Sequence, residues 1–493
     1  MDAMKKYGFF ENRFFPAVFL LLSFAFLLVF SFSTSPLYAY TGFDSATFRT
    51  IGLGILQGKL PYADLFDHKG PLAFYFNAAG IGIIPGDWGI FLMQVLFMAV
   101  SAYLIYRTDC LFTDRKTAFV CVLLLFFPFV DFIVEGNQCE EWMMPFVTLS
   151  VYLVLSWMMR GEGLPHSPWC SLFYGISFSV LFFIRPNDAV MSIGSIMLGV
   201  FLVLMARKMY GNAALNVLAF LAGCAAVACP IMLYFSSMGI LDDMLFGTVF
   251  YNIRYADEIP FLSMSWGIIA VCAIIVGGLI WLAARDRKTA VMNYVLIPYL
   301  VLTLVFIGKR DYWHYLIPML PYVSLFFVFC LRYRLRPVVI AISVLFFSGS
   351  YYQDRMLVRN ILVNKEIKEI YVQTDRLFSL VPEEERNSVW NHDMFSFGES
   401  HPRVFSLVGA YFHAGVTPGN RVFIPFHRVN FGEEETLAAN APEWVMALNP
   451  DADDPDSRYL RENYTLAAST DDSCPCRIGL YGRSDGTSEE TLR

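Results

Sequence analysis

The stretch "DLFDHKGPL", residues 64–72, places four ionisable side chains within six positions of a mostly apolar chain. They are the carboxylates of Asp64 and Asp67, the imidazole of His68 and the ammonium of Lys69, and a Gly-Pro pair follows directly. Carboxylates and imidazoles accept and deliver protons, and an ammonium stabilises anionic groups. What this stretch does depends on the side of the membrane on which it lies.

Five further stretches carry ionisable or aromatic residues at noteworthy positions. Taken singly, each has an ordinary explanation: a basic residue at a helix end extends to the headgroups, an Asp after a helix caps it, and His or Tyr beside other aromatics belongs at the interface. The stretches are "YTGFDSATF" with Asp44, "EGNQCEEW" with Glu140 and Glu141, "FIRPND" with Arg185 and "YNIRYADE" with Arg254, together with "GKRDYWHYLIPMLP", which holds Lys309, Arg310, His314 and Tyr315.

The composition predicts a polytopic α-helical membrane protein. Of 493 residues, 56% are apolar and 16% are charged, whereas a water-soluble chain carries roughly 25% charged residues. Apolar runs near the length that crosses a bilayer recur through the first two thirds of the chain. They predict about eleven transmembrane helices, near 14–33, 88–106, 117–134, 142–159, 169–184, 187–206, 213–236, 263–284, 291–308, 313–331 and 337–352.

Basic residues orient these helices, because cytoplasmic loops carry the excess of Lys and Arg. With the N-terminus in the cytoplasm, every loop-type basic cluster falls on the cytoplasmic side. The clusters are Lys5, Lys6 and Arg13; Arg107, Arg115 and Lys116; Arg160; Arg207 and Lys208; Arg285, Arg287 and Lys288; and Arg332, Arg334 and Arg336. The acidic and basic stretches described above then gather at the opposite, outer face, which their separate ordinary explanations do not account for.

Two domains are predicted. Residues 1–353 form the transmembrane domain, with a first outer loop at 34–87 that contains two helices lying along the membrane interface. Residues 354–493 form an extracytoplasmic α/β domain, with a helix over 363–381 and strands at "RVFIPF", "EWVMAL", "YTLAAS" and "CRIGLYG". No Walker or Rossmann motif occurs, which argues against a nucleotide-driven pump or a nucleotide-dependent enzyme, and nothing indicates a nucleic-acid partner.

The outer face combines carboxylates, which deprotonate an acceptor or hold a metal, with cations that hold a departing phosphate. A sugar carried on a polyprenyl phosphate requires both, and its lipid tail explains a site at the bilayer surface. The order "FDSATFRTIGLGILQGKLPYADLFDHKGPL" resembles the first-loop signature of GT-C glycosyltransferases, in the bacterial branch related to protein O-mannosyltransferases and aminoarabinose transferases. "EGNQCEEWMMPF" and "RDYWHYLIPMLP" resemble two further signatures in the right order, so that the resemblance covers roughly residues 15 to 330.

This resemblance implies an inverting glycosyltransferase that moves a sugar from a polyprenyl-phosphate donor to an envelope glycan, lipid or protein acceptor. Asp44 would be the catalytic base or a metal-side carboxylate, Glu140 or Glu141 the second acid, and Lys69 the contact to the lipid phosphate. If the protein uses a divalent metal ion, Asp44 and Glu140 would hold it. Many relatives have two successive acidic residues at the first of these positions, whereas here Asp44 is followed by Ser45. This difference leaves metal dependence open. The other residues expected to contact substrate are Asp64, Asp67, His68, Arg185, Arg254, Arg310, His314 and Tyr315.

Two other classes remain alternatives. A transporter or lipid flippase would place ionisable residues near the bilayer midplane and break its helices, but the predicted helices are nearly free of charge at their centres. An O-antigen-type polymerase or ligase that takes a diphosphate-linked oligosaccharide shares the chemistry of the outer face. Analysis of the lipids that accumulate in a deletion strain would separate these classes by identifying the donor.

Overall fold

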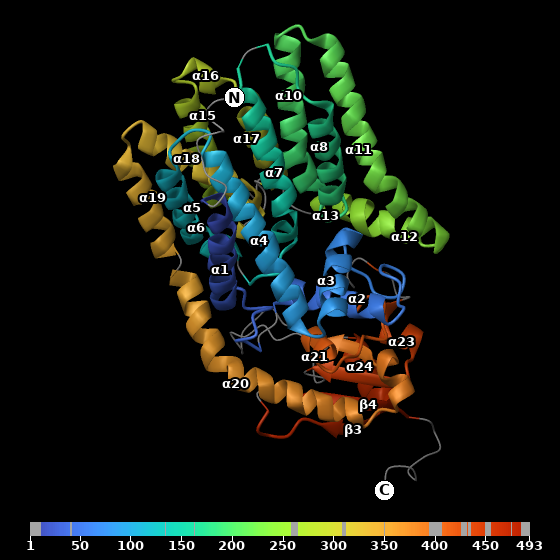
Figure 1. Cartoon of the computed structure of the whole chain (residues 1–493). Coiled ribbons are helices and arrows are strands. Elements are labelled where there is room, and N and C mark those ends of the chain that lie inside the picture. Colours follow the sequence, from blue (N-terminus) through green and yellow to red (C-terminus); the bar gives the residue numbers. More distant parts are fainter. Residues whose placement is uncertain are drawn as a thin grey trace. The chain divides into compact units, whose positions relative to one another are not determined.

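The computed structural model forms two compact units (Figure 1). The first unit comprises residues 1–31, 91–241 and 248–357, and the second comprises residues 32–90, 242–247 and 358–493. The first outer loop and the C-terminal part of the chain therefore belong to the same unit. The structure describes residues 11–39, 42–133, 135–161, 163–257, 265–307, 312–349, 351–393, 407–424, 431, 435–448, 455–474 and 476–484.

The first unit is a bundle of apolar helices. Its described elements are α1 (Glu11–Phe30), α4 (Asp87–Asp109), α5 (Arg115–Leu124), α6 (Phe126–Ile133), α7 (Cys139–Met159), α8 (Pro168–Phe182), α9 (Pro186–Asp188), the π-helix η1 (Ala189–Gly194), α10 (Ser195–Ala206), α11 (Tyr210–Ser237), α12 (Leu241–Leu245), the π-helix η2 (Phe246–Phe250), α13 (Tyr251–Asp257), α14 (Trp266–Cys272), the π-helix η3 (Ala273–Gly277), α15 (Gly278–Ala283), α16 (Arg287–Ala290), α17 (Asn293–Ile307), the 3₁₀-helix η4 (Trp313–Met319), α18 (Leu320–Arg332) and α19 (Arg336–Gly349). The first residues of α4, all residues of α12 except Leu241, and the first two residues of η2 fall in the second unit.

Every predicted transmembrane segment coincides with an apolar helix. Among the described residues, seven helical stretches are long and apolar enough to cross a membrane: Asp87–Asp109, Arg115–Ile133, Cys139–Met159, Pro186–Ala206, Tyr210–Ser237, Trp266–Ala283 and Trp313–Arg332. The other four predicted segments coincide with shorter apolar helices: Phe15–Phe30, Pro168–Phe182, Asn293–Ile307 and Arg336–Phe346. The polytopic helical fold class is confirmed, and the number eleven stays a prediction.

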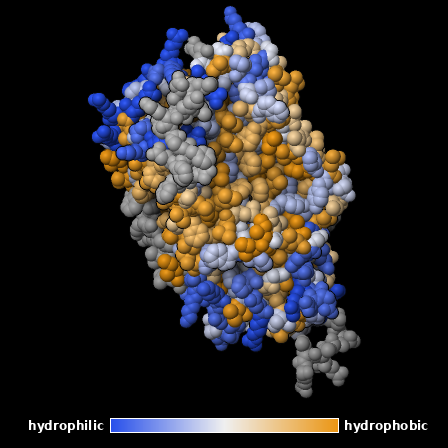
Figure 2. Space-filling model, in the orientation of Figure 1, coloured by the Kyte–Doolittle hydropathy of each residue, from blue (hydrophilic) through white to orange (hydrophobic). Residues whose placement is uncertain are grey.

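Helices α8 and α11 pack with their backbones in close contact. A Cβ atom on Gly175 would lie 2.0 Å from the carbonyl oxygen of Phe220, and one on Gly223 would lie 2.1 Å from that of Leu172. Small residues at a helix crossing allow this approach between membrane helices, where packing rather than water exclusion drives association. The opposite side of α11 exposes leucines such as Leu218 and Leu233, and Figure 2 shows hydrophobic residues covering much of the surface that the long helices form.

The second unit contains the predicted small α/β fold. Its described elements are α2 (Phe43–Leu56), α3 (Pro71–Ile83), most of α20 (Tyr351–Ser379), the 3₁₀-helix η5 (Glu383–Ser388), β1 (Trp390–Asp393), α21 (Leu407–His413), α23 (Leu437–Asn440), β2 (Trp444–Leu448), α24 (Pro455–Asn463), β3 (Tyr464–Ser469) and β4 (Ile478–Arg483). The strand order is β1-β2-β4-β3; β1 and β2 are parallel, and the other two pairs are antiparallel.

Along each strand, successive side chains point to opposite faces of the sheet. Both faces carry buried side chains that pack against helices. Met446 and Leu448 of β2 join a core with residues of α20 and α21. Val445 and Ala447 point to the opposite face and pack with residues of α23 and α24. The sheet is therefore the middle layer of three.

Helices α2 and α3 confirm the two helices expected in the first loop. They approach so closely that a Cβ on Gly52 would lie 2.8 Å from the backbone nitrogen of Ala78. Helix α2 buries polar residues such as Thr47 and Arg49 as well as apolar ones, so its surroundings are largely protein. Its place along a membrane interface stays a prediction.

One predicted strand is wrong and one strand was missed. "RVFIPF" covers 421–426, and its described part, 421–424, is irregular, because side chains bind its backbone: Asn420 donates to the Val422 carbonyl and Asn391 to the Phe423 carbonyl. The missed strand, β1, reads "WNHD"; Asn and Asp are poor strand formers, so its composition conceals it.

We predict that Gly175→Ala destabilises the bundle, because the new methyl group would meet the Phe220 carbonyl oxygen rather than a side chain that moves aside. Overpacking of this kind costs about 1–3 kcal/mol or more, measurable as a lower midpoint of thermal unfolding in detergent micelles. Gly211→Ala in α11 is the control, since no heavy atom lies within 4 Å of its added Cβ. Equal midpoints for the two variants would contradict the close crossing.

Candidate active site

The structure gathers six of the predicted site residues into two clusters, one in each unit. The first-unit cluster joins Glu140, Arg185 and Tyr315. The second-unit cluster lies on the turn between α2 and α3 and joins Asp67, His68 and Lys69. Each is built by a different part of the fold.

In the first-unit cluster, one guanidinium is held by two buried carboxylates and an aromatic ring. Arg185 donates to Glu140 and lies 3.2 Å from the carboxylate of Asp188, and its guanidinium carbon is 3.5 Å from the centre of the Tyr315 ring. Glu140 is 1% exposed and Asp188 is fully buried. A buried carboxylate requires a counter-charge, and the guanidinium of Arg185 supplies one positive charge to this pair of acids.

Local sequence explains how these residues meet. Glu140 lies in the first turn of α7, and Arg185 precedes the short helix α9 that Pro186 begins. Asp188 ends α9 three residues after Arg185, and the π-helix η1 follows immediately. π-Helical turns are rare and occur frequently at functional sites. Asp188 is not among the residues predicted from the sequence, although its position three residues after Arg185 could have indicated contact between the two side chains.

Glu141 has a different role from that of its neighbour. Its carboxylate accepts hydrogen bonds from the backbone of Gln138, at 2.8 Å, and from the side chain of Gln94, at 3.0 Å. The first of these belongs to a capping box that begins α7. Glu141 is thus engaged in fixing the start of the helix that carries Glu140.

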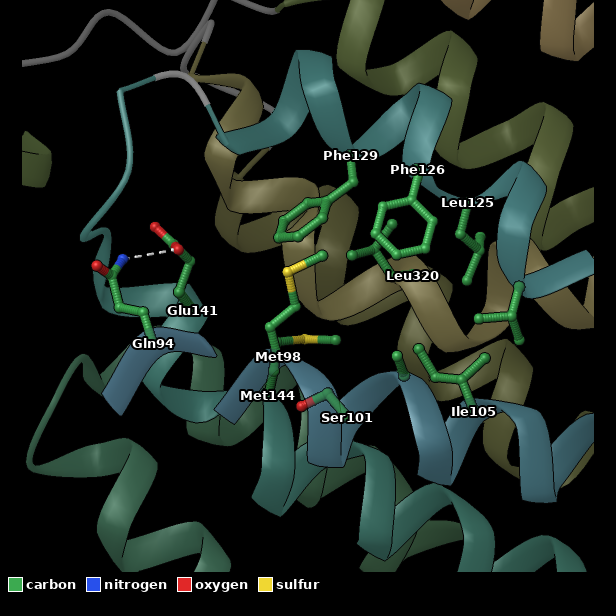
Figure 3. A pocket seen from close by; sticks show the side chains of 12 residues that line it. Gln94, Met98, Ser101, Ile105, Leu125, Phe126, Phe129, Glu141, Met144 and Leu320 are labelled. Carbon is green, nitrogen blue, oxygen red and sulfur yellow. Dashed lines mark hydrogen bonds between the residues drawn. The ribbon is translucent and has the colours of Figure 1, made fainter. Parts of the chain in front are cut away.

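A pocket lies beside Glu141 in the first unit (Figure 3). Glu141 and Gln94 form a polar end, and the remaining walls come from α4, α5, α6, α7 and α18. The pocket has a cavity volume of about 40 Å³ and is open at its mouth. Its lining is mostly apolar, with Met98, Phe126 and Phe129 among its side chains.

In the second-unit cluster, Lys69 lies at the end of a hydrogen-bonded chain. Its ammonium is 3.0 Å from Nε2 of His68, and Nδ1 of His68 is 3.2 Å from the Asp67 carboxylate. Because an ammonium only donates, Nε2 must accept, which leaves the ring hydrogen on Nδ1 facing Asp67. Asp67 therefore orients His68, and His68 orients Lys69.

The backbone after Lys69 adds to the positive potential of this turn. Gly70 is the N-cap of α3 and Pro71 its first residue, so the N-terminal end of a 13-residue helix follows Lys69 directly. Helix N-termini carry partial positive charge and unpaired N–H groups. A half-buried ammonium beside such an end favours an anion.

Asp44 lies in the first turn of α2, where the helix dipole favours a carboxylate. It is half-buried, and in the part of the chain that the structure describes no group forms a hydrogen bond or ion pair with it. In contrast to Glu140, its carboxylate is thus available to a substrate hydroxyl.

Two other ionisable residues of the first loop have structural partners. Asp64 accepts from the Leu60 backbone at 2.6 Å, which closes the turn. Lys59 donates to the carbonyl oxygens of Asn387 and Pro418. Burial lowers the pKa of Lys59 to about 8, and the nearby Asp64 carboxylate opposes this shift.

Three residues predicted to contact substrate remain: His314, Arg254 and Arg310. They take no part in the hydrogen bonds and ion pairs described above or lie outside the described residues. His314 packs edge-on against Tyr315, with ring centres 4.6 Å apart, and so borders the first-unit cluster. Arg254 lies in α13 with an exposed side chain. Arg310 and its neighbour Lys309 lie outside the described residues.

The described residues do not fit a metal site. No group of three or more His, Cys, Asp or Glu side chains that could hold a metal ion occurs among them. Glu140, one of the two predicted metal ligands, is already paired with Arg185, and a metal ion held by Asp44 and Glu140 stays a prediction. No catalytic step is therefore derived through a metal.

Comparison with known proteins supports the fold and the resemblance. A sequence model of the family described as dolichyl-phosphate-mannose-protein mannosyltransferase matches residues 68–235, a range that contains Lys69, Glu140 and Arg185. No curated protein matches the sequence.

Two crystal structures of ArnT from Cupriavidus metallidurans are similar over nearly the whole chain. The one bound to undecaprenyl phosphate is 12% identical with a TM-score of 0.61, and the match covers 96% of this chain and 98% of that one. The apo structure is 12% identical with a TM-score of 0.59, covering 94% and 98%. The chain therefore has the fold of ArnT, and the predicted resemblance is confirmed at the level of the fold.

We predict that Arg185→Leu destabilises the first unit by roughly 3–5 kcal/mol, the usual effect of removing one partner of a buried ion pair. The cause is the pair of carboxylates, Glu140 and Asp188, that would remain without a counter-charge. Thermal unfolding in detergent measures the effect, and adding Glu140→Gln and Asp188→Asn should recover part of it.

Arg332→Leu is the matched control, because that arginine pairs with Asp286 at an exposed site and such pairs contribute about 0–1 kcal/mol. If Arg185→Leu is no more destabilising than Arg332→Leu, the buried pairing does not hold the cluster together.

Proposed function

We propose that this protein transfers a sugar from a polyprenyl-phosphate donor to an envelope glycan, lipid or protein acceptor at the outer face of the membrane. The observation that carries the proposal is the Asp67–His68–Lys69 chain, which orients an ammonium at the N-terminal end of α3. Phosphate is the anion that this arrangement suits. The ArnT fold, found in a protein crystallised with undecaprenyl phosphate, supports a lipid-linked phosphate.

The reaction we propose is a single displacement with inversion at the anomeric carbon. The Asp44 carboxylate takes the proton of the acceptor hydroxyl while the acceptor oxygen forms a bond to the anomeric carbon. The bond from that carbon to the phosphate oxygen breaks, its electron pair stays on the phosphate, and Lys69 stabilises the developing charge. The transferred sugar would be a hexose or a pentose.

The first unit, taken by itself, offers further groups of the kinds that such a reaction uses. Arg185, held by Glu140 and Asp188, offers a fixed cation, and Tyr315 and His314 border it. The apolar pocket beside Glu141 suits a hydrocarbon chain. We place the N-terminus in the cytoplasm and the chain after residue 353 outside it, on the strength of the basic loops.

Asp44→Asn tests the base. The amide keeps the shape of the side chain and removes the proton acceptor, so the single-turnover rate should fall by roughly 10²-fold or more, with binding of undecaprenyl phosphate retained. Lipid extracted from a deletion strain supplies the donor.

The control is Asp114→Asn, whose carboxylate caps α5 by accepting from the backbone of Lys116 and Thr117; an amide serves equally as a cap. A near-normal rate for Asp44→Asn would show that Asp44 is a helix-end residue only, and the role would pass to Glu140 or Glu141.

Lys69→Ala tests the phosphate contact. Loss of a charge-assisted hydrogen bond worth about 1.5–3 kcal/mol should weaken binding of undecaprenyl phosphate and slow transfer. Lys69→Arg should restore only part of the affinity, since a planar fork does not replace a point charge. Isothermal titration with the protein in nanodiscs measures the affinity.

Lys368→Ala is the matched control, because it removes an exposed lysine of α20 in the same unit and leaves the contacts of the first loop unchanged. Unchanged affinity and rate for Lys69→Gln would reduce Lys69 to a lysine that extends to the headgroups and would remove the main support for the proposal.

A further inference from the structure

Arg421, in the C-terminal part of the second unit, is hydrogen bonded to the turn that carries Lys69. Its Nε donates to the carbonyl oxygen of Tyr62 at 2.8 Å, and its own carbonyl accepts from the backbone N–H of Phe66, also at 2.8 Å. The guanidinium also donates to the carboxylate of Asp243 at 2.7 Å. One residue thus contacts the turn at two backbone positions and is itself fixed by a carboxylate.

The turn depends on outside support because its backbone is strained. Tyr62 has a φ of 72°, in the left-handed region that a bulky side chain rarely adopts. Such a conformation costs of order 1–3 kcal/mol and persists where the surroundings hold it. Tyr62 is fully buried, and its backbone N–H donates to the Leu65 carbonyl at 2.8 Å.

Tyr62 also connects Arg421 to Lys69. The Tyr62 hydroxyl donates to the carbonyl oxygen of Lys69 at 2.8 Å. The path from the C-terminal part of the chain to the ammonium is therefore short: Arg421 holds the backbone of Tyr62, and the Tyr62 side chain holds the backbone of Lys69.

We propose that Arg421 is a positioning residue that sets the place of the Lys69 ammonium, and that this is a role of the C-terminal part of the chain in donor binding. The proposal rests on the proposed function, because it assumes that Lys69 contacts the donor phosphate.

The hydrogen bonds to backbone carry this role more than the ion pair does. The Arg421 and Asp243 side chains are 30% and 35% exposed, and ion pairs at such sites contribute little. The rings of Phe66 and Phe431, whose centres lie 6.0 and 5.8 Å from the guanidinium carbon, keep it against the turn. Asp243→Asn should accordingly have a milder effect than Arg421→Ala.

The test is a double-mutant cycle on the full chain in nanodiscs, with undecaprenyl phosphate as the probe. Arg421→Ala should weaken binding by roughly tenfold, the effect of one or two lost hydrogen bonds. In the Lys69→Ala background the same substitution should change binding by less than about twofold, because the group that Arg421 positions is then absent. A residue that only stabilised the fold would give no such coupling.

Gln57→Ala is the matched control, since Gln57 also joins the first loop to the C-terminal part, by a bond to the Gly415 carbonyl at 2.9 Å, but contacts neither Tyr62 nor Lys69 through it. Its affinity for the probe should be unchanged. If Arg421→Ala fails to fold, Tyr62→Phe tests the same path, because it removes only the hydroxyl bonded to the Lys69 carbonyl. It should weaken binding several-fold with Lys69 present and have no effect with Lys69→Ala.

Additive effects of Arg421→Ala and Lys69→Ala, or wild-type affinity for Arg421→Ala, would overturn this inference. Wild-type affinity for Lys69→Ala alone would instead overturn the proposed function, so the two failures are distinguishable.

Discussion

A charged group withdrawn from water must meet an opposite charge or a hydrogen-bond partner, and this constraint organises both clusters. In the first unit it brings Glu140 and Asp188 to the same guanidinium nitrogen of Arg185. In the second unit it aligns a carboxylate, an imidazole and an ammonium in successive residues, Asp67 to Lys69. The surrounding helices serve these pairings by bringing the partners to the ends of elements, where backbone groups are unpaired as well.

The two acids that sequence motifs single out have different environments, and their chemistry should differ for that reason. Asp44 is half-buried at the start of α2, with no partner among the described residues. Glu140 is nearly fully buried and paired with Arg185. Acid and base roles follow from such contrasts in the environments of titratable groups. The contrast favours Asp44 as the group that exchanges a proton and Glu140 as the group that fixes a cation.

The second unit shows how a loop between two helices acquires a defined shape. Residues 57–69 contain no helix of their own, and the bonds that hold them come from far along the chain: Lys59 to Asn387 and Pro418, and Arg421 to Tyr62. These hydrogen bonds to residues outside the loop hold its backbone in a defined position. Precise placement of a binding group requires such support from neighbouring residues.

The sequence by itself determined the membrane class, the positions of the apolar helices and the residues of the Lys69 turn. Long apolar runs, the Gly-Pro pair after Lys69 and the motif order are local features, and local features can be read from sequence. Only the tertiary structure decided which charges meet. Arg185 pairs with Glu140, which lies 45 positions away in the sequence, and Arg421 donates a hydrogen bond to the carbonyl of Tyr62, which lies 359 positions away. Such pairings depend on how helices pack and not on spacing along the chain. The same reason explains the failed strand prediction, because in the described part, 421–424, the Phe423 carbonyl accepts from the distant Asn391 side chain and the Arg421 carbonyl from the backbone N–H of Phe66.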